Sequence, residues 1–216
     1  MPNALAYYPN EKYISKNWAP EQVPVNALRA LAKAQMLAQK NNILPPALAA
    51  ALLPNSLVEG RLTTDEGSPS DFGFNYFGYP HAPEHDNAMM KMGLKVGKSN
   101  YPPKSVTDSW GDAEWENWHR TQPKLDVYKV DNGYTLNEDG ESMDPSHSED
   151  AAAKMAAIAL AHKARLYGQD KAIERWNGQG SGARNHASKV QEMARMLNHP
   201  KNALLRQAYE QMMKGK

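Results

Sequence analysis

The sequence predicts a mainly α-helical protein with a small β-hairpin or loop region. Apolar residues recur at helical spacing over residues 24–42, residues 47–53 are apolar on every side, and the chain reads as successive helices from Asp144 onward. The 216 residues, 41% hydrophobic and 23% charged, are enough to bury one sizeable core. We therefore expect a single domain over residues 1–216.

Composition excludes several classes of protein. The chain has no cysteine, which excludes a disulfide scaffold and thiol chemistry. Prolines divide the most apolar stretch, so no run approaches the roughly 20 residues that span a bilayer. The amino-terminal residues lack a basic region followed by an apolar core, so we expect no secretory signal.

Charge is uneven along the chain. The formal net charge is +1, yet residues 151–216 contain 12 Lys and Arg against 4 Asp and Glu, an excess of 8. Such a basic region suits an anionic polymer, either nucleic acid or cell wall. The ordinary explanation for most of these residues is a solvated helix face.

The first elements are an arm and a helix. Residues 1–23 show no periodicity, and we expect an extended amino-terminal arm that packs through its aromatic side chains. A helix then begins near Pro24 and ends around Asn41-Asn42, with apolar positions at helical spacing and basic residues between them.

The stretch from Leu44 to Pro80 contains the candidate catalytic acid, Glu59. Two prolines suit the first turn of a buried helix, and Pro54 is expected to kink or restart it, with Asn55 or Ser56 capping a short turn that carries Glu59. An apolar run that ends at a carboxyl group half-buries it, which disfavours the ionised form and suits a general acid. The alternative is a glutamate exposed at a helix end.

The segment after Glu59 is rich in turn formers, and we expect a short hairpin or an irregular loop. Asp65, Glu66 and Asp71 lie in it, and any one could serve as a second carboxylate, although acids in loops are usually only solvated. Farther on, His81, Glu84, His85 and Asp86 form a cluster, but a zinc site needs about four convergent ligands with a supporting shell. We therefore predict no metal and no cofactor.

Aromatic residues and a turn mark the middle of the chain. Trp110, Trp115 and Trp118 lie close together, and the last two share a face if the segment is helical. Core packing is the default for such a stripe, while stacking on sugar rings in a glycan groove is the alternative. The turn Asp131-Asn132-Gly133 predicts a hairpin over about residues 125–136.

Two segments of the sequence carry motifs in a recognisable order. In residues 44–79, an apolar helix leads to Glu59-Gly60 and the turn Gly73-Phe74-Asn75. Residues 143–190 contain, in order, Asp144-Pro145, Tyr167-Gly168-Gln169-Asp170, Trp176-Asn177-Gly178-Gln179-Gly180 and Lys189-Val190. Together the two segments resemble the lysozyme-like superfamily, specifically lytic transglycosylases and goose-type lysozymes, which have Glu-Ser and a Gly-Leu-Met-Gln-like turn in the first segment. The run Asn75-Tyr76-Phe77-Gly78 is also similar to the Asn-Leu-Phe-Gly run of bacterial glucosaminidases.

The resemblance implies a lysozyme-like α+β catalytic domain, with about residues 81–142 as an insertion flanking the cleft. It implies that Glu59 protonates the glycosidic oxygen between N-acetylmuramic acid and N-acetylglucosamine of peptidoglycan and then acts as a base. It further implies substrate contacts from five residues: Phe74, Asn75, Tyr76, Trp176 and Asn177. The amide of Asn177 suits a sugar acetamido group, while its ordinary role is to end a helix.

Three functions therefore follow from the sequence. The first is a muralytic glycosidase, either a lytic transglycosylase or a lysozyme, with a glucosaminidase acting on the other glycan bond as a variant. The second is a catalytically silent virion structural or injected protein with a lysozyme-like fold, and the third is a helical module that binds nucleic acid, which we consider unlikely. The absence of a signal peptide, the compact size and the loose fit to the motifs of the bacterial families indicate a bacteriophage origin, either an endolysin or a virion-associated protein. The expected partners are peptidoglycan strands and other virion proteins. The expected location is the virion, or the host cytoplasm with delivery to the cell wall.

Overall fold

A computed structural model describes residues 3–60, 62, 83–98, 102, 104–121, 125–130, 133–136 and 145–215. The described chain is mainly helical with two small sheets, which confirms the predicted mainly α class. None of the described helices is both long and apolar enough to cross a membrane.

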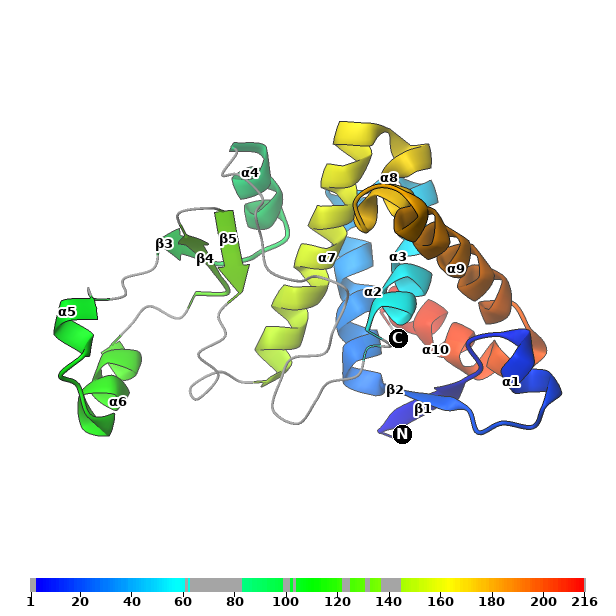
Figure 1. Cartoon of the computed structure of the whole chain (residues 1–216), viewed down its shortest axis with the longest axis horizontal. Helices are drawn as coiled ribbons and strands as arrows, with labels where there is room; N and C mark the ends of the chain where they lie inside the picture. The colour runs from blue at the N-terminus through cyan, green and yellow to red at the C-terminus, as the bar shows by residue number, and fades with distance from the viewer. Residues whose placement is uncertain are drawn as a thin grey trace.

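Six helices form the main body of the molecule (Figure 1). They are α2 (Val25–Lys40), α3 (Pro46–Glu59), α7 (Pro145–Tyr167), α8 (Gln169–Trp176), α9 (Ser181–Leu197) and α10 (Ala203–Met213). α7 packs against α2 and α8, α3 packs against α9, and α10 packs against α2. Their apolar faces form one continuous core, because each of the six helices contributes buried side chains to a single cluster.

The restart of the helix predicted at Pro54 does not occur in α3. The helix runs unbroken from Pro46 to Glu59, and neither Asn55 nor Ser56 caps a new turn, since both side chains are buried within the helix. A proline inside a helix costs about 3 kcal/mol. The burial of Leu48, Leu52 and Leu57 outweighs that cost, at about 1.5–3 kcal/mol for each side chain.

The segment predicted as an amino-terminal arm forms a hairpin. β1 (Ala4–Tyr7) pairs antiparallel with β2 (Glu21–Pro24), and the short helix α1 (Glu11–Ser15) lies between them. The period-2 pattern of this segment is too short to read from sequence, since each strand has four residues. A 3-10 turn, η1 (Pro200–Asn202), holds the hairpin: the Asn202 side chain accepts from the Tyr8 N–H (2.7 Å) and donates to the Tyr8 carbonyl (2.9 Å).

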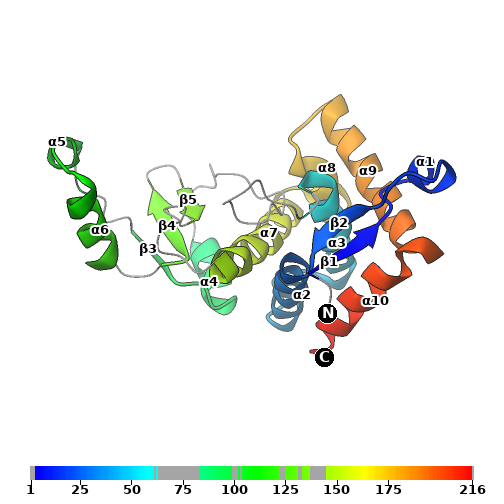
Figure 2. The ribbon, with the colours of Figure 1, turned by 90° about the horizontal axis from the view of Figure 1, so that it is seen from below.

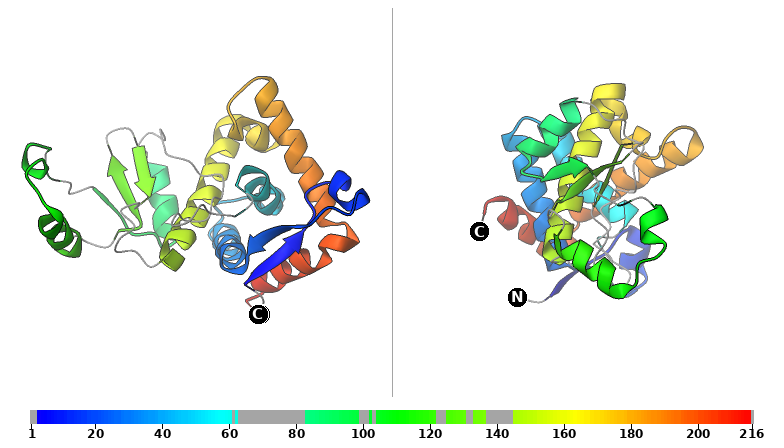
Figure 3. Two further views of the ribbon diagram at one scale, coloured as in Figure 1. Left: turned by 60° about the horizontal axis from the view of Figure 1, so that its bottom comes forward. Right: turned by 90° about the vertical axis from the view of Figure 1, so that its left-hand side faces the viewer.

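A smaller region projects from the helical body (Figures 1 and 2). It contains α4 (Pro83–Lys91), β3 (Val96–Lys98), α5 (Lys104–Thr107), α6 (Asp112–Thr121), β4 (Val127–Val130) and β5 (Gly133–Leu136). β4 and β5 pair antiparallel across residues 131–132, which confirms the predicted hairpin. β3 pairs in parallel with β4, a contact that the sequence did not predict. Figure 3 shows α5 and α6 at the end of the molecule farthest from α9 and α10.

Candidate active site

Glu59 is the last residue of α3, and its side chain is partly buried, with 18% of its surface exposed. The turns before it carry the buried residues Leu48, Leu52 and Leu57, which anchor α3 in the core. Gly60 ends the helix, with its N–H donating to the Ser56 carbonyl at 3.1 Å. The apolar helix therefore delivers one carboxyl group from the core to the protein surface.

Asn177 reaches the same carboxyl group from α8. It follows Trp176 at the carboxyl end of that helix, and its Nδ2 donates a 3.1 Å hydrogen bond to Glu59 Oε1. Gly178 and Gly180 have φ values of 84° and 88°, in the left-handed region that favours glycine. These two residues turn the chain from α8 into α9 directly after Asn177. The structure thus brings together Glu59 and Asn177, one from each of the two segments singled out in the sequence.

His186, on α9, is the third residue at the carboxyl group. Its Nδ1 lies 2.9 Å from Glu59 Oε1, and its side chain is only 4% exposed. Its other ring nitrogen, Nε2, lies 2.9 Å from Oδ1 of Asn55, a fully buried residue one turn before Glu59 on α3. The ring is therefore held at both nitrogens between two residues of one helix. We call Asn55, Glu59, Asn177 and His186 the Glu59 cluster.

Sequence reasoning missed half of the Glu59 cluster. Asn55 was interpreted as a helix cap, although it lies four residues before Glu59 and so shares its helix face. His186 lies at helical spacing between the buried residues Ala183 and Val190, a pattern that places it on the inner face of α9. These two spacings were the available signals.

The other predicted site residues have different outcomes. Trp176 is half-buried and packs against the hydrophobic core. Asp65, Glu66, Asp71, Phe74, Asn75 and Tyr76 all lie outside the described residues. Trp115 packs edge-on against Trp110 and Trp118, with ring centroids 5.0 and 6.0 Å apart. Trp115 and Trp118 belong to α6, which lies far from α3 in the views of Figures 1 and 2, so the structure does not bring this cluster to Glu59.

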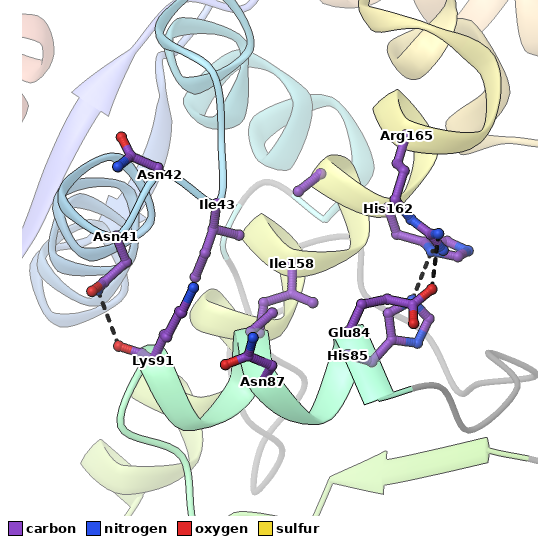
Figure 4. A pocket seen from close by; sticks show the side chains of 12 residues that line it. Asn41, Asn42, Ile43, Glu84, His85, Asn87, Lys91, Ile158, His162 and Arg165 are labelled. Atoms are coloured by element: carbon purple, nitrogen blue, oxygen red, sulfur yellow. Dashed lines mark hydrogen bonds and ion pairs between the residues drawn. The ribbon is translucent and has the colours of Figure 1, made fainter.

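A second polar group lies in a pocket of about 230 Å³ between α4, α7 and the end of α2 (Figure 4). His85 Nε2 is 2.7 Å from His162 Nδ1, and Glu84 forms a 2.8 Å ion pair with Arg165. Burial, reinforced by the positive charges around it, lowers the pKa of His162 to about 4. This group joins α4 to α7 and thereby attaches the projecting region to the helical body.

The acidic and histidine residues of α4 do not converge on one point. Glu84 contacts Arg165 and His85 contacts His162, while Asp86 binds Lys129 at 2.7 Å and the Tyr134 hydroxyl at 2.8 Å. Among the residues that the structure describes, no group of three or more His, Asp and Glu side chains is arranged to hold a metal ion. His81 lies outside the described residues.

Comparison of the chain with models of protein families, with curated proteins and with solved structures finds no match. The lysozyme-like fold therefore stays a prediction, and the function has to be argued from the Glu59 cluster.

Proposed function

We propose that this protein is a muralytic glycosidase that cleaves the β-1,4 bond between N-acetylmuramic acid and N-acetylglucosamine of peptidoglycan, with Glu59 as general acid and base on a lysozyme-like fold. One observation carries the proposal. A partly buried carboxyl group at the end of a buried helix is held at a single oxygen, Oε1, by Asn177 and by His186. A carboxyl group fixed in this way has one oxygen left to exchange a proton with a substrate.

The proposed reaction has two steps. In the first, the O–H bond of the protonated Glu59 carboxyl group breaks, its proton passes to the glycosidic oxygen, and the bond from that oxygen to the anomeric carbon breaks with its electron pair leaving on the oxygen. In the second, the carboxylate removes a proton from the attacking hydroxyl group as that oxygen bonds to the anomeric carbon. The hydroxyl belongs either to the substrate, which forms an anhydro ring, or to water, and lytic cleavage is the product we favour.

Asn177 is placed to contact the substrate as well as Glu59. Its side chain is exposed, and its Nδ2 is engaged with Glu59. Its Oδ1 accepts a hydrogen bond from a sugar acetamido N–H in the proposed complex. Phe74, Asn75, Tyr76 and Trp176 remain proposed substrate contacts on the strength of the resemblance. Asp65, Glu66 or Asp71 would supply the second carboxylate that a hydrolase often needs.

The biological setting is also part of the proposal. A muralytic protein of bacteriophage origin acts on glycan strands, either as part of the virion or after release from the host cytoplasm. The rival functions are a silent virion structural or injected protein with the same fold, and a glucosaminidase that cleaves the other glycan bond.

Turnover of purified peptidoglycan by the wild type, by Glu59→Gln and by the control Glu192→Gln tests the proposal. Glu192 is exposed on α9, so its substitution removes one carboxylate without touching the Glu59 cluster. We expect the wild type and the control to release soluble muropeptides. For Glu59→Gln, we expect the rate of release to fall by about 10²–10⁴-fold.

Mass spectrometry of the released muropeptides identifies the reaction. Anhydro-muramyl ends indicate a lytic transglycosylase, reducing muramic ends a lysozyme, and reducing glucosamine ends a glucosaminidase. Absence of any release by the wild type, or full activity of Glu59→Gln, would reject the assignment and favour the structural role.

A further inference from the structure

Asn55 and His186 are polar residues in an apolar helix interface. α3 and α9 pack through Leu, Val, Ala and Met side chains, yet Asn55 is fully buried between them and only 4% of His186 is exposed. Burying polar groups stabilises a fold less than burying an aliphatic side chain of the same size, unless every hydrogen bond is made. A role in packing alone therefore does not account for these two residue types.

The hydrogen bonds of Asn55 are incomplete. One end of its amide, Oδ1 in the structure, contacts His186 Nε2 at 2.9 Å, while the other end has no hydrogen-bond partner in the described part of the chain. A buried polar atom without a partner destabilises the fold. This destabilisation calls for an explanation outside stability. Among the described residues, the ring of His186 is the one side chain within hydrogen-bond distance of the Asn55 amide.

The effect of this arrangement is to fix the plane of the His186 ring. A neutral imidazole has one N–H, so when Nδ1 donates to Glu59 Oε1, Nε2 accepts from the amide of Asn55, turned to present Nδ2 to the ring. The imidazole then cannot rotate without losing a bond at each end. Asn177, at the carboxyl end of α8, donates a hydrogen bond to the same Oε1. The carboxyl group is thus oriented by two side chains at one oxygen, which selects Oε2 as the oxygen that faces a ligand.

We infer that His186 is a positioning residue for Glu59, that Asn55 orients its ring, and that together they make Oε2 the oxygen that exchanges the proton with substrate. This inference rests on the proposed function, because it assigns the reacting atom of the same carboxyl group. As Oε2 gives its proton to the glycosidic oxygen, the developing negative charge is stabilised by the hydrogen bonds to Oε1. Neither residue touches the substrate.

Three substitutions separate positioning from packing. His186→Leu removes both nitrogens and suits the apolar interface, but it leaves the buried Asn55 amide without its partner, so we expect a lower melting temperature and compare kcat well below it. We expect its kcat to fall about 10²-fold with KM nearly unchanged, since binding of the glycan does not involve the lost bond. His186→Asn keeps a short polar side chain with a donor near the position of Nδ1, and should recover most of the lost kcat.

Asn55→Leu tests whether Asn55 orients the ring of His186. It leaves His186 in place but removes the group that holds Nε2, so we expect a smaller loss of kcat than for His186→Leu. Gln35→Leu is the matched control: Gln35 is also buried and also accepts one side-chain hydrogen bond, from Tyr209 at 2.7 Å, but it belongs to α2 and does not contact the Glu59 cluster. Its kcat should equal that of the wild type once both are measured well below their melting temperatures.

A spectroscopic readout keeps this inference separate from the proposed function. The ¹³C resonance of the Glu59 carboxyl carbon, recorded for the wild type, His186→Leu and His186→Asn, reports the hydrogen bonds at Oε1 whether or not a glycan is cut. We expect the resonance to move in His186→Leu and to return toward its wild-type position in His186→Asn.

The outcomes are distinct. A wild type that cuts no peptidoglycan but shows the carboxyl shift rejects the proposed function while the orientation of Glu59 by His186 stands. A wild type that is active, with His186→Leu equally active or with an unmoved carboxyl resonance, overturns the inference and leaves the proposed function intact.

Discussion

Asn177 Nδ2 donates a 3.1 Å hydrogen bond to Glu59 Oε1 and so joins two residues that are 118 positions apart in the chain. Because the partner is an uncharged amide, the carboxyl group gains a hydrogen bond without a second charge beside it. A carboxylate at position 177 would place two negative charges within contact distance.

Asn177→Asp tests this relationship. At neutral pH we expect the variant to be about 1 kcal/mol less stable than the wild type, since two like charges about 4 Å apart in water repel by that amount. Asn177→Ala is the control, because it removes the hydrogen bond without adding charge; equal stability of the two variants, measured by urea unfolding at neutral pH, would contradict the expectation.

Much of the fold could be predicted, because its signals are local. The helical spacing of residues 25–40, the helices after Pro145 and the turn between β4 and β5 each depend on neighbouring residues. The continuity of α3 through Pro54 could not be predicted, since it depends on leucines that are buried by distant helices. The contact between Asn55 and His186 spans 131 positions, and no pattern within either helix specifies which residues of the other helix it will meet.

The buried Asn202 should be a large contributor to stability. Its side chain binds the N–H and the carbonyl of Tyr8 and also the Met196 carbonyl at 2.7 Å. Asn202→Ala leaves these backbone groups without their partner, and we expect a loss of about 2–3 kcal/mol in the free energy of unfolding. Asn198→Ala is the matched control, because that side chain is exposed and should change stability by less than about 0.5 kcal/mol. Similar losses for both would show that Asn202 does not hold the hairpin.

Asp150 forms an ion pair with the buried side chain of Lys154. Burial by itself raises the pKa of this carboxyl group, but hydrogen bonds from Lys154 and Lys33 outweigh burial and hold the pKa below its usual value. Asp150→Asn leaves Lys154, whose side chain is 8% exposed, without its negative partner, and should cost about 3 kcal/mol at neutral pH. In the wild type, this contribution is present above the usual carboxyl range and is lost as the pH falls through the lowered pKa of Asp150.

Thermal unfolding of Asp150→Asn and of Glu174→Gln checks this prediction. The pair between Lys171 and Glu174 is exposed on α8, so breaking it should change stability little. If Asp150→Asn has the same melting temperature as the wild type, the contact between α7 and Lys33 of α2 is not a source of stability.

The lowered pKa of His162 predicts that the protein is less stable in mild acid. Burial lowers its pKa to about 4, with the charges of His85, Arg165 and Lys163 acting in the same direction and Glu84 opposing them. In the unfolded chain the group titrates near 6.5, so between the two values the unfolded state binds more protons. The stability is therefore full above about pH 6.5 and decreases as the pH falls toward about 4.

His162→Gln removes this titration. We compare the free energy of unfolding in urea for the wild type and the variant from neutral pH to about pH 4. It should decrease less for the variant. If the free energy of unfolding changes with pH in the same way for both proteins, the contact between α4 and α7 does not depend on the charge of His162.

The bond between Asn202 and Tyr8 also has a consequence for how the protein is made. The strands β1 and β2 leave the ribosome before the turn whose side chain secures them, and that turn follows nearly all the helices in the chain. A two-stranded ribbon is marginal by itself in water. During translation, the hairpin therefore gains the contact that stabilises it only after α9 and η1 have left the exit tunnel.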